Sequence, residues 1–285
     1  MPYKPKLWQQ ILYQVIFALV ALFVLLPIWE LAYLAFDGGV VGWPTSFHLL
    51  PSQPTLDIFV TMWNQAGQSV TFLNALENSL IVSIGSAALA VALGASMAYA
   101  FARFRFPGRQ TGLFGLLLGT LLPPVALMTP LFVLFRSLHI QATLLALTLV
   151  YTSFSMPFAI WNMRVAFQSA PRELEEAAFL DGAGHFTAFW RISLPLALPA
   201  IGIAALVAFL IAYSEFAMGW LFVNRSDQVT LAMAISGILN GNNLSWSRLA
   251  ALAILMCAPV VVIFVILQKS ILERMLFNSP GNGAS

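Results

Sequence analysis

The residues best suited to chemistry lie in one polar segment, residues 169–195, between two long apolar runs. Glu173, Glu175 and Glu176 open the segment, and Asp181 and Gly182 follow. Carboxylates next to small alanines suit close contact with another protein. No nucleophile–base pair or catalytic carboxylate pair stands out, and the histidines lack the spacing of metal ligands. The segment therefore favours binding over catalysis, and we expect no metal site.

ATP binding is a second kind of chemistry that the chain cannot supply by itself. A phosphate-binding P-loop requires Gly-x-x-x-x-Gly-Lys-Ser/Thr, whose lysine reaches the phosphates. The lysines of this chain are Lys4, Lys6 and Lys269, and none follows such a glycine pattern. If the protein uses ATP, a separate chain must bind and hydrolyse it.

The composition indicates an integral membrane protein. Hydrophobic residues make up 60% of the chain, charged residues only 8%, and the mean hydropathy is +0.87. A soluble domain carries about 25% charged residues, so this chain could not cover a water-exposed surface. The net charge of +2 implies no strong attraction to nucleic acid.

Long apolar runs predict an all-α bundle of about six transmembrane helices, formed by residues 1–285 as a single domain with its core at about 78–272. Each run approaches or exceeds the roughly 20 residues that cross a bilayer. None alternates polar and apolar residues as a membrane β-strand would. The runs are residues 11–36, 78–102, 111–135, 142–167, 196–222 and 249–272.

Basic residues predict the orientation, because they accumulate on the cytoplasmic side of a membrane. With the N-terminus inside, ten of the 13 lysines and arginines lie at the inner face. The other three are Arg136, Arg225 and Arg248. We therefore expect a multi-pass membrane protein with both termini and the segment 169–195 in the cytoplasm.

Prolines shape both the spans and the polar segment. Pro123-Pro124 and Pro130 predict kinks in the third span, Pro157 in the fourth and Pro259 in the sixth. These kinks suit helices around a pathway, but ordinary irregularity of membrane helices explains them equally well.

Within residues 169–195 we expect two short helices joined by a turn, with a plain amphipathic loop as the alternative. Pro171 suits the first turn of the first helix. Gly182 can take the left-handed conformation that ends it. Residues 186–192 would form the second helix, with Phe186, Phe189 and Trp190 on roughly one face, against the membrane spans.

This segment resembles the signature of permease subunits of ATP-binding-cassette (ABC) importers: Glu-Ala-Ala, three residues, Gly, nine residues, Ile-x-Leu-Pro. The longer form, from Glu175 to Ala183, is similar to the carbohydrate-uptake branch. Residues 98–108, 157–161 and 214–216 resemble further elements of that branch, so the resemblance covers about 78–269. Six spans and a short N-terminus resemble the smaller maltose-type permease, although residues 273–283 depart from its glycine- and alanine-rich tail. The signature positions are Glu176, Ala177, Ala178, Gly182, Ile192, Leu194 and Pro195.

The resemblance implies a type I ABC importer permease of a prokaryotic plasma (inner) membrane that forms half of a translocation pathway. Its partners would be a second permease, a homodimeric cytoplasmic ATPase carrying ATP and Mg, an extracytoplasmic solute-binding protein, a sugar and membrane lipid. The chain itself would bind no cofactor and would not be an enzyme. The residues expected to couple it to the ATPase are Glu175, Glu176, Ala177, Ala178, Asp181, Gly182, Ala183, Ile192, Leu194 and Pro195.

Residues that would contact the cargo are less marked. Tyr151, Asn162, Tyr213 and Glu215 could hydrogen-bond a sugar, and each could equally serve helix packing. An importer of the same architecture for a polyamine or phosphonate is an alternative. An ion-coupled secondary transporter is a weaker one, since only Glu30 and Glu215 are candidate intramembrane carboxylates and no internal repeat is clear.

Overall fold

A computed structural model describes residues 6–40, 50–67, 70–223, 225–239 and 245–277, with side chains described as far as Ile266. The regular elements of these residues are helices, and the extended pairing found among them is one isolated bridge between Asp37 and Pro54. The prediction of an all-α membrane protein is confirmed. The predicted departure of the tail, 273–283, falls largely outside the described residues.

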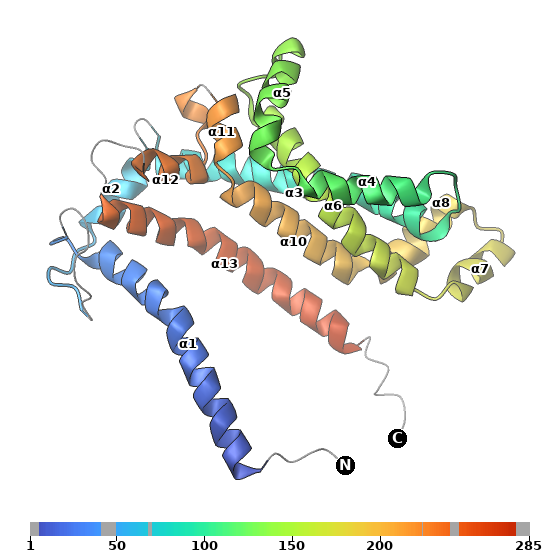
Figure 1. Cartoon of the computed structure of the whole chain (residues 1–285), viewed down its shortest axis with the longest axis horizontal. Coiled ribbons are helices and arrows are strands. Elements are labelled where there is room, and N and C mark those ends of the chain that lie inside the picture. The colour runs from blue at the N-terminus through green and yellow to red at the C-terminus, as the bar shows by residue number, and fades with distance from the viewer. Residues whose placement is uncertain (1–5, 41–49, 68–69, 224, 240–244, 278–285) are drawn as a thin grey trace.

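Three long helices pack together at the centre of the molecule (Figure 1): α3 (Phe72–Arg103), α6 (Leu144–Ser169) and α10 (Leu198–Ser214). The buried face of α3 is rich in alanine and serine, and a Cβ atom added to Gly94 would lie 3.0 Å from Cε of Met163. Such small residues let membrane helices approach closely. The Ser86 hydroxyl also donates a hydrogen bond of 3.1 Å to the carbonyl of Thr148 on α6. Close packing therefore fixes the ends of α3 and α6 relative to each other.

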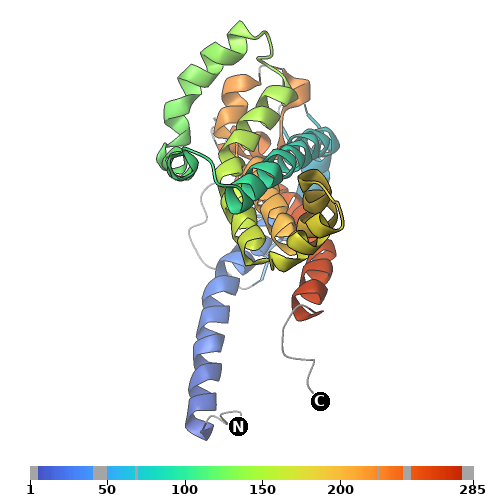
Figure 2. The same cartoon turned by 90° about the vertical axis from the view of Figure 1, so that its right-hand side faces the viewer.

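The first and last helices, α1 (Leu7–Phe36) and α13 (Trp246–Phe277), meet near one end and diverge toward the other (Figures 1 and 2). Within α1 only Tyr33, Leu34 and Ala35 are buried. The most apolar 18-residue stretch of α1 is 0% buried within the chain. Lipid or another chain must cover this apolar surface, because it cannot face water.

Asp37, directly after α1, holds together the end at which α1 and α13 meet. Its buried carboxylate accepts hydrogen bonds of 2.8 Å from the backbone N–H groups of Gly39 and Ser52, and another from the Ser52 hydroxyl. The Ser247 hydroxyl of α13 donates to the Asp37 carbonyl at 3.4 Å. Burial by itself would raise the pKa of Asp37, but the donated hydrogen bonds outweigh it and hold that pKa well below its usual range.

Shorter helices complete the described structure. They are α2 (Asp57–Asn64), α4 (Arg109–Leu121), α5 (Pro124–Ser137), α11 (Ala217–Phe222), η2 (Ser226–Gln228) and α12 (Leu231–Leu239). Of these, α2, η2 and α12 pack against α3, and α2 and α12 also pack against α13. α11 contacts α5 and α6, α4 contacts α6, and α5 extends away from the three central helices (Figure 2).

Four of the described helices, α1, α3, α6 and α13, are long and apolar enough to cross a membrane. The count reaches six only if each of two bent helix pairs is taken as one span. One pair is α4 and α5, which meet at 102°. The predicted third span, 111–135, is therefore not one kinked helix, because the adjacent prolines Pro123 and Pro124 end α4 and start α5. Pro157 and Pro259, by contrast, lie inside the continuous helices α6 and α13.

The predicted fifth span, 196–222, is also divided. α10 begins at Leu198 and ends at Ser214, where Glu215 adopts an extended conformation before α11 begins. The second bent pair, His185–Leu196 with Leu198–Ser214, meets at 76° just before α10. Glu215 consequently lies at a break between two helices and not inside a continuous one.

Candidate functional site

The polar segment 169–195 folds at the end of the molecule where α3 and α6 finish (Figure 1). Its first helix is α7 (Glu173–Leu180), with the N-cap at Arg172. Pro171 therefore precedes the helix and does not stand in its first turn as predicted, because α7 begins two residues later. The three glutamates do lie in the first turn, where the positive end of the helix dipole stabilises negative charge.

The end of α7 follows the predicted mechanism. Gly182 has a φ of +85°, in the left-handed region. Its N–H bonds the carbonyl of Phe179 at 3.1 Å, and the N–H of Ala183 bonds that of Ala178 at 2.9 Å. This pair of bonds is the Schellman arrangement that closes many helices. Gly182 is thus confirmed as the residue that ends the helix and turns the chain.

The second helical part is longer and less regular than the predicted 186–192. It consists of α8 (His185–Ala188), the π-helical turn η1 (Phe189–Ser193) and α9 (Leu194–Leu196). A π-helical bond, from the N–H of Leu194 to the carbonyl of Phe189, closes η1 directly before Pro195, which has no N–H to donate. Ile192, Leu194 and Pro195 of the sequence pattern therefore lie at the transition toward α10.

The aromatic residues of this part do not share one face, so that prediction is wrong. Phe189 packs on Tyr99 and Phe167, with ring centroids 4.9 and 6.2 Å apart. Phe186 and Trp190 are exposed and stack on each other, with ring centroids 6.4 Å apart. Of these three aromatic residues, Phe189 is the one that packs against the membrane spans.

Two adjacent glutamates of α7, Glu175 and Glu176, differ in how far they are buried. Glu176 and Ala177 are exposed, Ala178 is half-buried, and Glu175 is buried at 6% exposure. A small cavity of about 150 Å³ next to them is lined by Tyr99, Arg103, Phe104, Arg172, Glu175, Glu176, Phe179 and His185. The outward side of α7 is thus not covered by other described parts of this chain, whereas the inward side packs against them.

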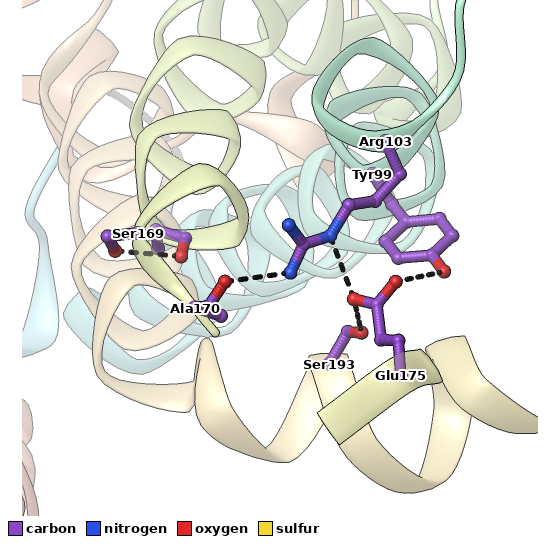
Figure 3. A network of polar contacts seen from close by, with 7 residues as sticks. Tyr99, Arg103, Ser169, Ala170, Glu175 and Ser193 are labelled. Carbon is purple, nitrogen blue, oxygen red and sulfur yellow. Dashed lines mark hydrogen bonds and ion pairs between the residues drawn. The ribbon is translucent and has the colours of Figure 1, made fainter. Parts of the chain in front are cut away.

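The carboxylate of Glu175 is the centre of a buried polar network (Figure 3). Its Oε1 accepts hydrogen bonds from Arg103 Nε at 2.8 Å and from the Ser193 hydroxyl at 2.6 Å. Its Oε2 accepts a longer bond of 3.3 Å from the Tyr99 hydroxyl. Arg103 Nη2 donates to the carbonyl of Ala170, the residue directly after α6, at 3.0 Å. The Arg103–Glu175 ion pair is buried, with side chains 5% and 8% exposed.

Sequence patterns do not point to Tyr99, Arg103 or Ser193 as functional residues, and residues 98–108 stand out only through their resemblance to an element of the carbohydrate-uptake branch. A signal was present, because residues four apart on a helix share a face and a buried arginine requires an anionic partner. The partner itself lies 72 residues along the chain from Arg103. That distance explains why spacing alone did not identify it.

Three of the four residues predicted to line a substrate pathway make side-chain hydrogen bonds within the chain. The Tyr151 hydroxyl donates to Oε2 of Glu215 at 2.6 Å, and Glu215 also accepts from the N–H groups that open α11. The Tyr213 hydroxyl donates to the carbonyl of Met256 at 3.0 Å. The Oδ1 atom of Asn162 is buried and has no hydrogen-bond partner among the described residues. The structure does not bring the four together, and contact with a substrate stays a prediction for each.

A family model described as binding-protein-dependent transport system inner membrane component matches residues 90–277. The trehalose transport system permease protein SugB of Mycobacterium tuberculosis is 31% identical over 229 residues, which are 80% of this chain and 82% of the relative. The maltodextrin transport system permease protein MdxG of Bacillus subtilis is 30% identical over 222 residues, 78% of each chain.

The fold is similar to that of a solved ABC transporter. A chain in the crystal structure of a bacterial ABC transporter involved in the import of the acidic polysaccharide alginate matches with a TM-score of 0.77 and 20% identity. The match covers 94% of this chain and 99% of that chain. A second structure of such a transporter, in complex with an alginate pentasaccharide-bound periplasmic protein, matches with a TM-score of 0.67 and 18% identity.

Proposed function

Because the chain belongs to the family of binding-protein-dependent transport system inner membrane components, we propose that it forms half of the translocation pathway of an ATP-driven carbohydrate importer. It is a multi-pass inner membrane protein and a permease subunit, not itself an enzyme. The observation that carries the proposal is the similarity, over most of both chains, to permeases named for trehalose and for maltodextrin uptake.

The proposed complex contains a second permease, two copies of a cytoplasmic ATPase and an extracytoplasmic solute-binding protein. ATP and Mg²⁺ bind to the ATPase, since the sequence of this chain lacks a P-loop. The family description and the solved complex with a sugar-loaded periplasmic protein support a solute-binding partner.

The exposed side of α7 is the proposed contact with the ATPase. Glu176 offers a carboxylate in a helix first turn, and Ala177 next to it leaves room for close approach. The turn at Gly182 sets the direction in which α8 leaves α7. Closure of the ATPase dimer would push α7 and, through the attached spans, switch the pathway between inward-open and outward-open.

Both termini lie in the cytoplasm in this proposal. Arginines support the orientation, because Arg103, Arg105, Arg109 and Arg172 all flank the end of the bundle where α7 lies. Reaction of single cysteines at Arg172 and Arg225 with an impermeant thiol reagent in intact cells tests it, on a Cys257→Ser background. We expect labelling at position 225 only, and labelling at 172 contradicts the orientation.

The transport proposal is tested by reconstituting the four-component complex in liposomes and measuring uptake of trehalose, maltotriose and an alginate trisaccharide. We expect uptake of at least one sugar that requires internal ATP and the solute-binding protein, and that survives ionophores which collapse the ion gradients. Uptake that persists without ATP and stops with the ionophores contradicts the proposal and indicates a secondary transporter.

A further inference from the structure

Glu175 is the glutamate of α7 that the exposed contact with an ATPase leaves unexplained. We propose that Glu175 is a positioning residue that makes α7 move as one body with the ends of α3 and α6 and with η1. The assignment of an ATPase as the partner that pushes α7 rests on the proposed function, whereas the network around Glu175 lies wholly within this chain.

The carboxylate reaches each of these elements through a separate bond. Arg103 and Tyr99 belong to α3, and Ser193 ends η1, which leads toward α10. Arg103 extends the connection to α6 through its bond to the Ala170 carbonyl. One side chain of α7 thus connects, directly or through one intermediate, the ends of two membrane helices and the segment that enters a third.

Burial makes this connection stiff. The two charges of the ion pair lie 2.8 Å apart with side chains 5% and 8% exposed, so water and salt screen them little. A displacement of α7 alone would separate these buried charges, which is strongly unfavourable. A displacement of α7 together with α3 and α6 leaves the pair intact.

Aromatic packing surrounds the same connection. The ring of Tyr99 lies 4.9 Å from that of Phe189 in η1 and 5.6 Å from that of Phe167 in α6. Phe167 is fully buried. The apolar contacts therefore join α3, α6 and η1, the elements to which the polar network connects α7.

The outward side of α7 has a different character. Leu180 is 90% exposed, and Glu173 and Glu176 are exposed as well. A force applied there reaches the membrane helices through the inward side, where Glu175 is the buried ionisable residue of α7. In this proposal Glu176 contacts the ATPase, and Glu175 transmits the movement of α7 to the membrane helices.

The distance between α7 and α3 tests the proposal. Cysteines replace Gly184, in the turn after α7, and Ser96 on α3, on a Cys257→Ser background. Both positions are exposed, and a Cβ added to Gly184 meets nothing within 4 Å. Pulsed electron paramagnetic resonance of nitroxides at these sites is recorded for the full complex without nucleotide and after trapping with ATP and vanadate.

With Glu175 present we expect one narrow distance distribution that does not change on trapping. In Glu175→Gln, which keeps the side-chain shape but removes the charge, we expect a broader distribution whose mean shifts on trapping by more than the parent width. Glu173→Gln, an exposed change in the same helix, should match the parent. A Glu175→Gln distribution as narrow and unmoved as the parent overturns the proposal.

Two further arrangements keep the test decisive. If Glu175→Gln does not assemble, Arg103→Lys replaces it, because a single ammonium cannot bond Glu175 and Ala170 in the same geometry. We expect Arg103→Lys to show the same broader and shifted distance distribution, and its absence overturns the proposal. If no ATPase co-purifies with the parent, the proposed function fails, and the width measured on the chain alone in lipid nanodiscs still decides whether Glu175 holds α7.

Discussion

The carboxylates of Glu175 and Glu215 both accept a hydrogen bond from a tyrosine, but they differ in their other hydrogen-bond donors. Each accepts a hydrogen bond from a tyrosine on a membrane helix, Tyr99 at 3.3 Å for Glu175 and Tyr151 at 2.6 Å for Glu215. Each also lies where a helix of the bundle gives way to a shorter element. The two sites differ in where their other donors come from.

The other donors to Glu175 are side chains of distant elements, those of Arg103 and Ser193, which are 72 and 18 residues away. The other donors to Glu215 are the backbone N–H groups of Ala217 and Met218, two and three residues away. Distant side-chain donors join elements that would otherwise move separately. Local backbone donors satisfy the free N–H groups of a new helix and fix where it starts.

The largest expected effect comes from disrupting the turn at Gly182, which ends α7. Proline cannot adopt the φ of +85° found at Gly182, because its ring fixes φ near −65°. We expect Gly182→Pro to abolish uptake in the reconstituted complex while the chain still inserts into membranes. Gly182→Asn is the matched control, since asparagine tolerates the left-handed region, and it should keep most of the uptake. Normal uptake by the proline variant would contradict the coupling role of the loop.

A smaller effect, on thermal stability, is expected when either of the two carboxylates is removed. Glu175→Ala leaves Arg103 buried without its counter-ion, which costs about 3 kcal/mol. Glu215→Ala removes hydrogen bonds from a hydroxyl and from backbone N–H groups at a helix start, which costs about 1 kcal/mol. Thermal unfolding of the two variants in the same detergent should therefore place Glu175→Ala below Glu215→Ala. The reverse order would mean that the local cap at Glu215 matters more to the fold than the network.

The smallest effect concerns the tyrosines. Tyr151→Phe and Tyr99→Phe each remove one hydroxyl, and a single hydrogen bond contributes about 1 kcal/mol. The shorter bond belongs to Tyr151, so we expect its loss to lower the unfolding temperature more than that of Tyr99. Equal shifts would indicate that the 3.3 Å bond of Tyr99 contributes as much as the 2.6 Å bond.

Local chemistry explains which parts of the structure were predictable. The end of α7 depends on Gly182 and its immediate neighbours, and the sequence alone located it. The apolar runs likewise predicted α1, α3, α6 and α13, because composition suffices to place a membrane helix. The Glu-Ala-Ala pattern led to the family for the same reason, since its residues are close together in sequence.

Features that depend on distant partners or on exact turn geometry were not predictable. Glu175 and Glu176 look alike in sequence, and only the packing against α3 buries one and exposes the other. The 102° bend between α4 and α5 exceeds what a kink at Pro123 and Pro124 suggested. The break at Glu215 has no proline beside it, because the proline of the apolar run 196–222, Pro199, lies at the start of α10.

The pairing of Arg103 with Glu175 also constrains how this protein can evolve. Arg103 uses Nε for Glu175 and Nη2 for the carbonyl of Ala170, a division that no other side chain reproduces. A change at either position alone leaves a buried charge unmatched, so selection should remove it before a compensating change arises. Among descendants of this chain, the two positions are therefore expected to stay fixed together or to be exchanged together.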